Sequence, residues 1–246
     1  KELKDICYMI PCPKSPHGCD VDPTGEYIVG SGKLAALIPV FSFDKLQKAI
    51  AAKDFIGDYD GIPVVKYESA LYGEVKKPGL GPLHTEFDGK GNAYTSFFVS
   101  SEVVKWNIKD LKVLDRVPTY YSVGHLCIPG GDSKKPNPKY LIAYNKITKD
   151  RYLPTGPELS QSAQLYDISG DKMQLILDFP TIGEKHYAQA VAADVIKNKS
   201  VKFFKLEDNK HAFVANGEST TKVVREGNNV HVYMTAIRSH LTPDNI

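Results

Sequence analysis

Four of the seven histidines in this chain occupy related places in the sequence, and imidazole is a group that binds metals and carries protons. His17, in the stretch SPHGCDVDPTGEYIV, is followed by an Asp-Pro-Thr-Gly turn and then by Tyr27. His84, in HTEFDGKGNAYTS, is followed by a similar turn and then by Tyr94. The shared order of histidine, turn and tyrosine indicates a repeated structural unit that carries the same chemical group.

Looser copies of this unit begin at two further histidines, in VGHLCIPGGDSKKPNPKYLIAY and in GEKHYAQAV. The steps between the four histidines are 67, 41 and 61 residues, which suit the four-stranded blade of a β-propeller if the longer steps contain insertions. The innermost strand of every blade lines the central axis, so residues at one place in successive blades approach one another. We therefore predict that four consecutive blades begin with His17, His84, His125 and His186, whose rings point to one centre.

This set of histidines favours a metal site. A single histidine is more often a hydrogen-bonded core or surface residue, but four at one repeat position are not explained in that way. Imidazole suits copper, zinc, iron and nickel, whereas calcium and magnesium prefer oxygen ligands, and no carboxylate stands at the matching positions. The other three histidines lack the following turn, and we interpret them as surface or strand residues: His211, His231 and His240.

The elements that must position these residues are mostly strands. Turn signals such as DPTG, DGKGN and SGDK separate short runs rich in Tyr, Val, Ile, Phe and Thr, which is typical of an all-β fold. Residues 92–108 predict an antiparallel hairpin with a tight connection at residues 100–102. One helix is expected within residues 42–55, because Phe43, Leu46 and Ile50 have helical spacing and Ser42 can cap them. The predicted fold is a partial β-propeller with small helical insertions.

Composition excludes several classes of function. The 246 residues are 42% apolar and 24% charged with a net charge of +2, so neither disorder nor nucleic-acid binding is indicated. The longest apolar run, residues 34–41, is too short for a membrane span. Because the chain opens on Lys1 without a signal region, we expect any export signal to have been removed or to lie outside this sequence.

The four cysteines leave several interpretations open, because they lack the paired spacing of a structural zinc site. Cys19 and Cys127 each lie two residues after a predicted ligand, so that both thiolate ligation and inert burial are open. Cys7 and Cys12 could form a disulfide in an oxidising compartment, across a short loop.

The stretches SPHGCDVDPTGEYIVGSGKL, GPLHTEFDGKGNAYTSFFVSSEVVKW, YYSVGHLCIPGGD and FPTIGEKHYAQA together resemble the catalytic propeller of the nitrous oxide reductase family. The resemblance runs nearly end to end and is greatest to the branch exported by the general secretory route. It implies a periplasmic, homodimeric enzyme of denitrification, in which a seven-bladed propeller is followed by a cupredoxin domain. On this basis residues 1–232 are expected to be a partial propeller and residues 233–246 the start of the connection to the cupredoxin domain, which the chain does not include.

The resemblance also implies the cofactors and partners. Copper-dependent reduction of nitrous oxide to dinitrogen and water takes place at a sulfide-bridged tetranuclear copper centre held by seven histidines. Four of these ligands are matched by His17, His84, His125 and His186, and the other three do not occur in this chain, so the chain is expected to be a fragment of the enzyme. A binuclear copper centre in the cupredoxin domain would receive electrons from a cytochrome or a cupredoxin.

Two departures from the family concern positions beside these ligands. Lys185 stands before His186 where the family usually has proline, which replaces a fixed backbone angle with a flexible one. Calcium is a further cofactor that the resemblance allows, but Ser15 stands where some members have an asparagine that helps to hold it.

Two residues match a lysine and an acid near the open edge of the family's copper centre. Lys146, in AYNKITKDR, and Glu184, in GEKH, are the expected catalytic residues, which would supply protons to the bound oxygen. The alternative interpretation is an ordinary surface ion pair.

Two other functions stay open. A lactonase-like hydrolase propeller would hold calcium or zinc largely through carboxylates and amides, and it would need acids where the histidines stand. A metal-free propeller that acts as a binding scaffold would tolerate replacement of every histidine.

Overall fold

The computed structural model describes residues 6–146, 161–181, 185, 187–190, 221–227 and 229–234. The chain divides into two compact units, Lys1–Ala192 and Ala193–Ile246. Most described residues of the first unit lie in antiparallel strands, as the alternation of strand formers and turns predicts. No helix among the described residues is long and apolar enough to cross a membrane.

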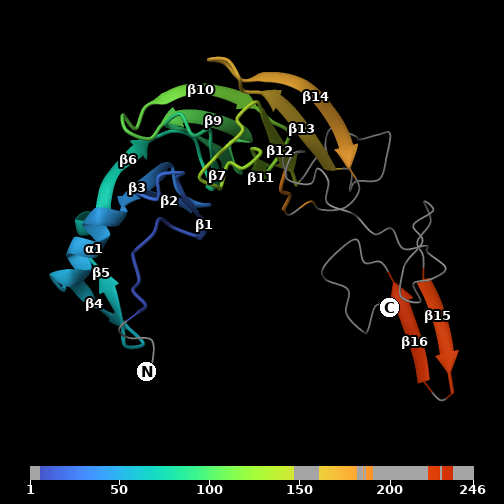
Figure 1. Ribbon diagram of the computed structural model, residues 1–246, viewed down its shortest axis with the longest axis horizontal. Coiled ribbons are helices and arrows are strands. Elements are labelled where there is room, and N and C mark those ends of the chain that lie inside the picture. Colours follow the sequence, from blue (N-terminus) through green and yellow to red (C-terminus); the bar gives the residue numbers. More distant parts are fainter. Residues whose placement is uncertain are drawn as a thin grey trace. The chain divides into compact units, whose positions relative to one another are not determined.

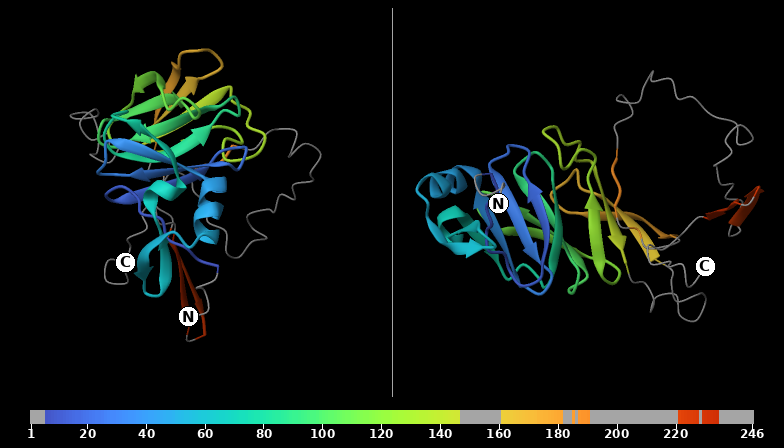
Figure 2. Two further views of the ribbon diagram at one scale, coloured as in Figure 1. Left: turned by 90° about the vertical axis from the view of Figure 1, so that its left-hand side faces the viewer. Right: turned by 90° about the horizontal axis from the view of Figure 1, so that it is seen from below.

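Three four-stranded antiparallel sheets make up most of the first unit, and they follow one another in sequence order (Figures 1 and 2). The first contains β1 (Pro16–Val21), β2 (Tyr27–Gly32), β3 (Leu37–Ser42) and β6 (Leu71–Lys76). The second contains β7 (Pro82–Phe87), β8 (Asn92–Phe97), β9 (Glu102–Asn107) and β10 (Val113–Pro118). The third contains β11 (Val123–Cys127), β12 (Tyr140–Asn145), β13 (Gln161–Asp167) and β14 (Gln174–Thr181).

These sheets are blades of a β-propeller, which confirms the predicted fold class. Strands pair in chain order within each sheet, and the first strand of each lies at one edge. The first strands also lie against one another, since β7 contacts both β1 and β11. Three of the four repeat histidines, His17, His84 and His125, lie on these first strands. The fourth, His186, lies outside the described residues.

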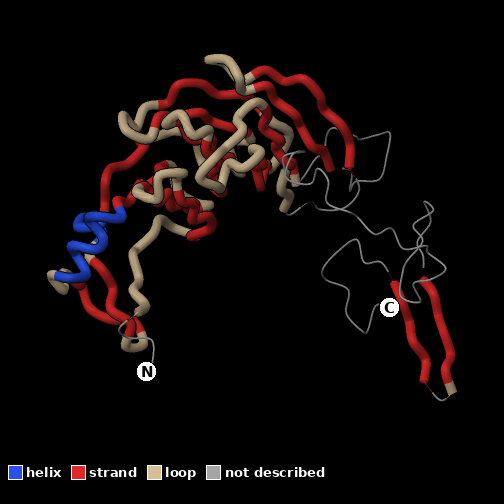
Figure 3. Tube along the Cα trace, viewed as in Figure 1, coloured by secondary structure: helices blue, strands red, loops and turns tan. Residues whose placement is uncertain are grey.

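The predicted helix is confirmed as α1 (Phe43–Ala51), and the Ser42 side chain caps it by accepting a hydrogen bond of 3.1 Å from the Lys45 N–H. The helix belongs to a larger insertion between β3 and β6, which also holds β4 (Phe55–Tyr59), β5 (Ile62–Val65) and α2 (Tyr67–Ala70). Figure 3 shows α1 beside the β4–β5 hairpin, away from β1. The insertion therefore extends the outer edge of the blade and leaves its inner strand unchanged.

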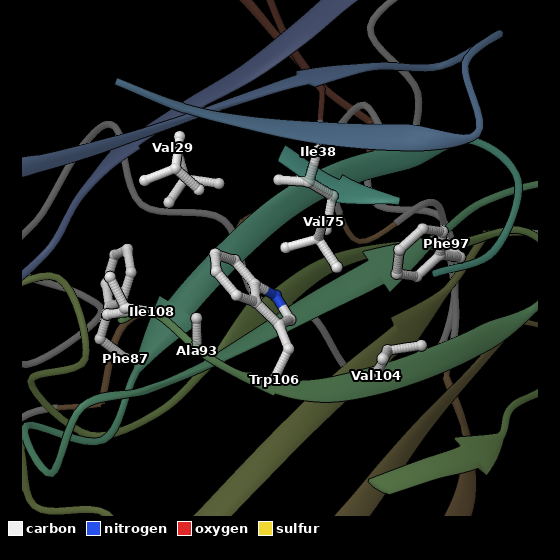
Figure 4. Packing of buried hydrophobic residues seen from close by; sticks show 10 residues of the cluster. Val29, Ile38, Val75, Phe87, Ala93, Phe97, Val104, Trp106 and Ile108 are labelled. Atoms are coloured by element: carbon white, nitrogen blue, oxygen red, sulfur yellow. The ribbon is translucent and has the colours of Figure 1, made fainter. Parts of the chain in front are cut away.

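The interface between the first two blades is a packed apolar core. Trp106 of β9 is fully buried at its centre, and its indole N–H donates to the Thr95 hydroxyl at 2.9 Å. In Figure 4 the indole lies between residues of the first blade, such as Val29 and Val75, and residues of its own blade, such as Ala93. A second cluster joins the second and third blades in the same way.

A polar contact joins the outer strands of the second and third blades. The Asp115 carboxylate on β10 accepts hydrogen bonds from the Met173 N–H at 2.8 Å and from the Lys172 ammonium at 2.9 Å. Partial burial acts to raise the pKa of Asp115, but these two hydrogen bonds and the charge of Lys172 hold it below its usual value. The carboxylate therefore stabilises the fold in its ionised form.

Replacement of Asp115 by Asn should lower the free energy of unfolding by about 1 kcal/mol near neutral pH. Since the pKa of Asp115 is lower in the folded chain than in the unfolded one, its contribution is present above about pH 4 and is lost as the pH falls further. Denaturant unfolding of both proteins at several pH values measures the difference. Asp110→Asn, at an exposed carboxylate, is the control; an Asp115→Asn effect that is the same at all pH values would contradict the account.

In the second unit, β15 (Thr221–Glu226) and β16 (Asn229–Met234) form an antiparallel pair.

The predicted hairpin of the second blade is confirmed as β8 and β9, with its connection at residues 98–101. The predicted domain boundary between residues 232 and 233 remains a prediction.

Candidate functional site

The rings of three repeat histidines lie together although their strands belong to three different blades. His84 is in the middle: its ring centroid lies 4.8 Å from that of His17, edge to face, and 3.7 Å from that of His125, nearly parallel. His17 is exposed, His84 is partly buried, and His125 is only 9% exposed. The repeat spacing in the sequence thus leads to three imidazoles in contact, and their role as metal ligands remains a prediction.

Each of these histidines lies in a register shift of its strand. Two residues of the first strand oppose a single residue of the second strand, as in a β-bulge. Such a bulge bends the strand and redirects the side chains of the two extra residues. The three pairs and their opposing residues are His17 with Gly18 opposite Ser31, Leu83 with His84 opposite Ser96, and Gly124 with His125 opposite Tyr144.

Serine hydroxyls hold two of the bulges from the second strand. Ser31 accepts from the Gly18 N–H at 2.8 Å and donates towards the Leu83 carbonyl at 2.5 Å, which joins the first blade to the second. Ser96 accepts from the His84 N–H at 3.3 Å. These hydrogen bonds satisfy backbone groups that have no partner in the irregular strand pairing, so they stabilise the bulges. Sequence reasoning missed both serines, which occupy matching positions on β2 and β8.

Gly18 permits the close approach of the first two blades. A Cβ atom at this position would lie 1.9 Å from the Leu83 carbonyl oxygen and 2.8 Å from the Ser31 hydroxyl. No side chain fits there unless the two strands move apart. The contact between the His17 and His84 rings therefore depends on a glycine that follows His17 directly.

Replacement of Gly18 by Ala should lower the free energy of unfolding by about 3 kcal/mol, since the clash is with backbone rather than with a flexible side chain. Chemical denaturation measures the loss. Gly170→Ala is the matched control, because a Cβ at Gly170 would meet no atom closer than 4.0 Å. Equal stability of the two variants would contradict the close approach of β1 and β7.

A cavity of about 140 Å³ is lined by Cys127, two residues after His125 on β11. The Tyr187 ring lines it and also contacts the His125 ring edge to face, with centroids 5.4 Å apart. Glu86 and Asp132 line it as well. The pKa of Glu86 is raised to about 8, mainly by burial and also by the charges of Asp132 and Asp20. A hydrogen bond from the Ile128 backbone acts in the opposite direction. The surroundings of the site therefore oppose the accumulation of negative charge.

The donor set fits copper by its chemistry. Three imidazoles meet, and imidazole is a preferred ligand of copper. Among the described residues no group of three or more His, Cys, Asp or Glu side chains is arranged to hold a metal ion. These three histidines would therefore need the remaining ligands of the complete protein to form a finished centre.

Of the two predicted catalytic residues, the structure places one beside the histidines. Lys146 follows β12, and its stem crosses Gly124, where a Cβ would lie 2.5 Å from the Lys146 Cε atom. Gly124 directly precedes His125, so the lysine lies next to that ligand candidate. Glu184 lies outside the described residues, and its pairing with Lys146 stays a prediction. Lys185 is partly buried and donates a hydrogen bond to the Thr181 hydroxyl.

All four cysteines are free thiols, so Cys7 and Cys12 do not form the disulfide that the sequence leaves open. The reason is local: Met9, two residues after Cys7, pairs with β5 through hydrogen bonds to Pro63 and Val65, which directs this segment to the insertion. Cys127 is buried in a small apolar cluster with Tyr144 and Ala163. Its surroundings favour inert burial over ligation.

Comparisons of the sequence with known proteins find one family. The nitrous oxide reductase propeller repeat matches residues 116–186. The chain is 36% identical to nitrous-oxide reductase from Stutzerimonas stutzeri over 96% of its own length and 38% of that protein. It is 34% identical to nitrous-oxide reductase from Pseudomonas fluorescens, and this match covers 93% of the chain and 36% of the relative. It is 36% identical to nitrous-oxide reductase from Cupriavidus necator, and this match covers 91% of the chain and 34% of the relative. The chain therefore spans little more than one third of these relatives.

Proposed function

Because the chain belongs to the nitrous-oxide reductase family, we propose that it supplies part of the site at which nitrous oxide is reduced to dinitrogen and water. The observation that carries the proposal is the contact of His84 with both His17 and His125, made by matching bulges of three consecutive blades. A propeller that serves only as a scaffold has no need to bring three imidazoles together.

The proposed reaction consumes two electrons and two protons for each nitrous oxide molecule and yields dinitrogen and water. His17, His84 and His125 would hold copper, with His186 as a fourth ligand from the following blade. Copper in a sulfide-bridged tetranuclear cluster would supply the binding site for this weak ligand and share the two electrons. The protein residues would then have to fix the geometry and deliver the protons.

The described residues support both tasks. Bulges held by Ser31 and Ser96 fix the backbone from which the rings of His17 and His84 extend. Contact among the rings limits their rotation, which keeps the nitrogen atoms in a fixed arrangement. The Lys146 stem lies over Gly124, so its Nζ atom is the proposed proton carrier beside His125, with Glu184 as its partner.

The remaining parts of the proposal concern the complete protein. We place it in the periplasm as a homodimer, with a cupredoxin domain that holds a binuclear copper centre and takes electrons from a cytochrome or a cupredoxin. Calcium stays an allowed structural ion. These features follow from family membership.

Metal and sulfide analysis of the full-length, natively purified protein tests the proposal. We expect copper together with acid-labile sulfide, and nitrous oxide consumption with a reduced electron donor. Calcium or zinc without copper would instead favour a lactonase-like hydrolase, and a metal-free active preparation would favour a binding scaffold. The histidines at the inner-strand positions, where such a hydrolase needs acids, argue against the former.

Replacement of Lys146 by Met keeps most of the stem and removes the charge. In the full-length protein it should leave the copper content unchanged and lower turnover by about 100-fold, the usual contribution of a positioned proton donor. Lys139→Met, at an exposed lysine just before β12, is the control and should turn over normally. Normal turnover of Lys146→Met would make Lys146 an ordinary surface residue.

A further inference from the structure

One face of β2 carries two glycines that make room for the segment before β1. Gly30 and Gly32 are two residues apart on the strand, so they share a face. A Cβ at Gly32 would lie 2.9 Å from the Pro13 Cβ, and a Cβ at Gly30 would lie 3.8 Å from the Cys12 sulfur. The Cys12 side chain therefore lies against the face of β2 at the position of Gly30.

Cys19 reaches the same place from β1. It pairs directly with Gly30 in the antiparallel register, and opposed residues in such a pair have Cβ positions about 5 Å apart on one face. The two thiols thus lie on either side of a position that carries no side chain.

Cys12 and Cys19 are both exposed in the part of the chain that the structure describes. Residues 11–15 belong to no helix or strand, while hydrogen bonds from Lys33 and Leu34 to the carbonyls of Ser15 and Lys14 keep the segment on β2. Closure of a disulfide would require this segment to shift along the glycine face until the two Cβ atoms are about 4 Å apart.

We propose that Cys12 and Cys19 are a redox-active pair that closes to an intramolecular disulfide by exchange with a small-molecule disulfide. One thiolate attacks the small disulfide and releases its first thiol, and the other cysteine then attacks the mixed disulfide and releases the second. The protein loses two protons and two electrons, and the small disulfide gains them as it becomes two thiols. The bond would tie the segment before β1 to a residue two positions after His17.

The other cysteines are poor partners for either thiol. The segment of Cys7 is bound to β5 of the insertion through Met9, and Cys127 is buried in an apolar cluster. This gives the proposal a specific pairing, which differs from the Cys7–Cys12 pairing that the sequence leaves open.

The test uses the full-length protein, reduced and then incubated with oxidised glutathione, blocked by alkylation and digested with trypsin. Cleavage after Lys14 separates Cys12 from Cys19, so a disulfide joins peptide 5–14 to peptide 15–33 and is identified by mass spectrometry. We expect this linked pair in the wild type and in Cys7→Ser, and its loss in Cys12→Ser and in Cys19→Ser. Circular dichroism confirms that each variant is folded.

Two results would overturn the proposal. One is a linked pair that disappears in Cys7→Ser, which would assign the bond to Cys7. The other is a wild type that carries only mixed disulfides with glutathione, or none, while it remains folded. Neither result bears on the proposed copper site, because the assay reads the cysteine bonds alone.

Discussion

Replacement of His84 by Ala in the full-length protein is expected to lower nitrous oxide reduction by more than about 100-fold and to lower the copper content of the propeller centre. His84 is the middle ring of the three and contacts both His17 and His125. Its loss would remove a proposed ligand and also the ring contacts with the other two histidines. The fold should persist, because the side chain contributes to none of the apolar clusters between the blades.

The measurements for His84→Ala are copper per chain, acid-labile sulfide and turnover, together with a circular dichroism spectrum. His231→Ala is the matched control, since His231 lies on β16 of the second unit and has no repeat context. It should retain copper and activity. Full activity of His84→Ala would remove this residue from the proposed site, and a loss of copper in both variants would point to a general defect in metal loading.

Replacement of Trp106 by Ala is expected to lower the free energy of unfolding by about 3–5 kcal/mol. The indole is fully buried between the first and second blades, and its N–H is bonded to the Thr95 hydroxyl. Truncation leaves a large cavity between two rigid sheets that cannot collapse without moving the blades. It also removes one of the two hydrogen bonds of the buried Thr95 hydroxyl, which keeps its bond with the Thr85 hydroxyl.

Denaturant unfolding of the wild type and of Trp106→Ala measures this loss, followed by circular dichroism because the variant has lost its tryptophan. Val113→Ala on β10 of the same blade is the control, since Val113 is 37% exposed and its truncation should change stability by less than about 0.5 kcal/mol. If Trp106→Ala costs no more than this control, the two blades do not depend on the cluster around the indole.

The sequence predicts the blades well because their signals are local. Alternation within β8 and β9, the Ser42 cap of α1 and the aspartate turns all depend on residues close in the chain. Asp22 illustrates this: its carboxylate accepts hydrogen bonds from Thr24 and from the Tyr27 N–H, which closes the turn after the first strand. The same turn at Asp88 made the repeat visible.

The details of the site depend on contacts between residues far apart in the chain. A register shift is a property of two paired strands, and no single strand reports it. The roles of Ser31 and Gly18 arise only where the second blade brings the Leu83 carbonyl against the first. The proximity of Cys12 to Cys19 likewise depends on which residue of β2 opposes Cys19, and sequence spacing does not report this pairing.

The paired bulges also determine where the chain can vary in length. Because two residues oppose one at each histidine, deletion of Leu83 or Gly124 would turn the bulge into a regular ladder and rotate the histidine away from its neighbours, although no histidine is lost. Such a deletion should therefore be as damaging as a substitution of the ligand. Among relatives, insertions and deletions should collect in segments such as residues 43–70, at the outer edge of the first blade, and avoid β1, β7 and β11.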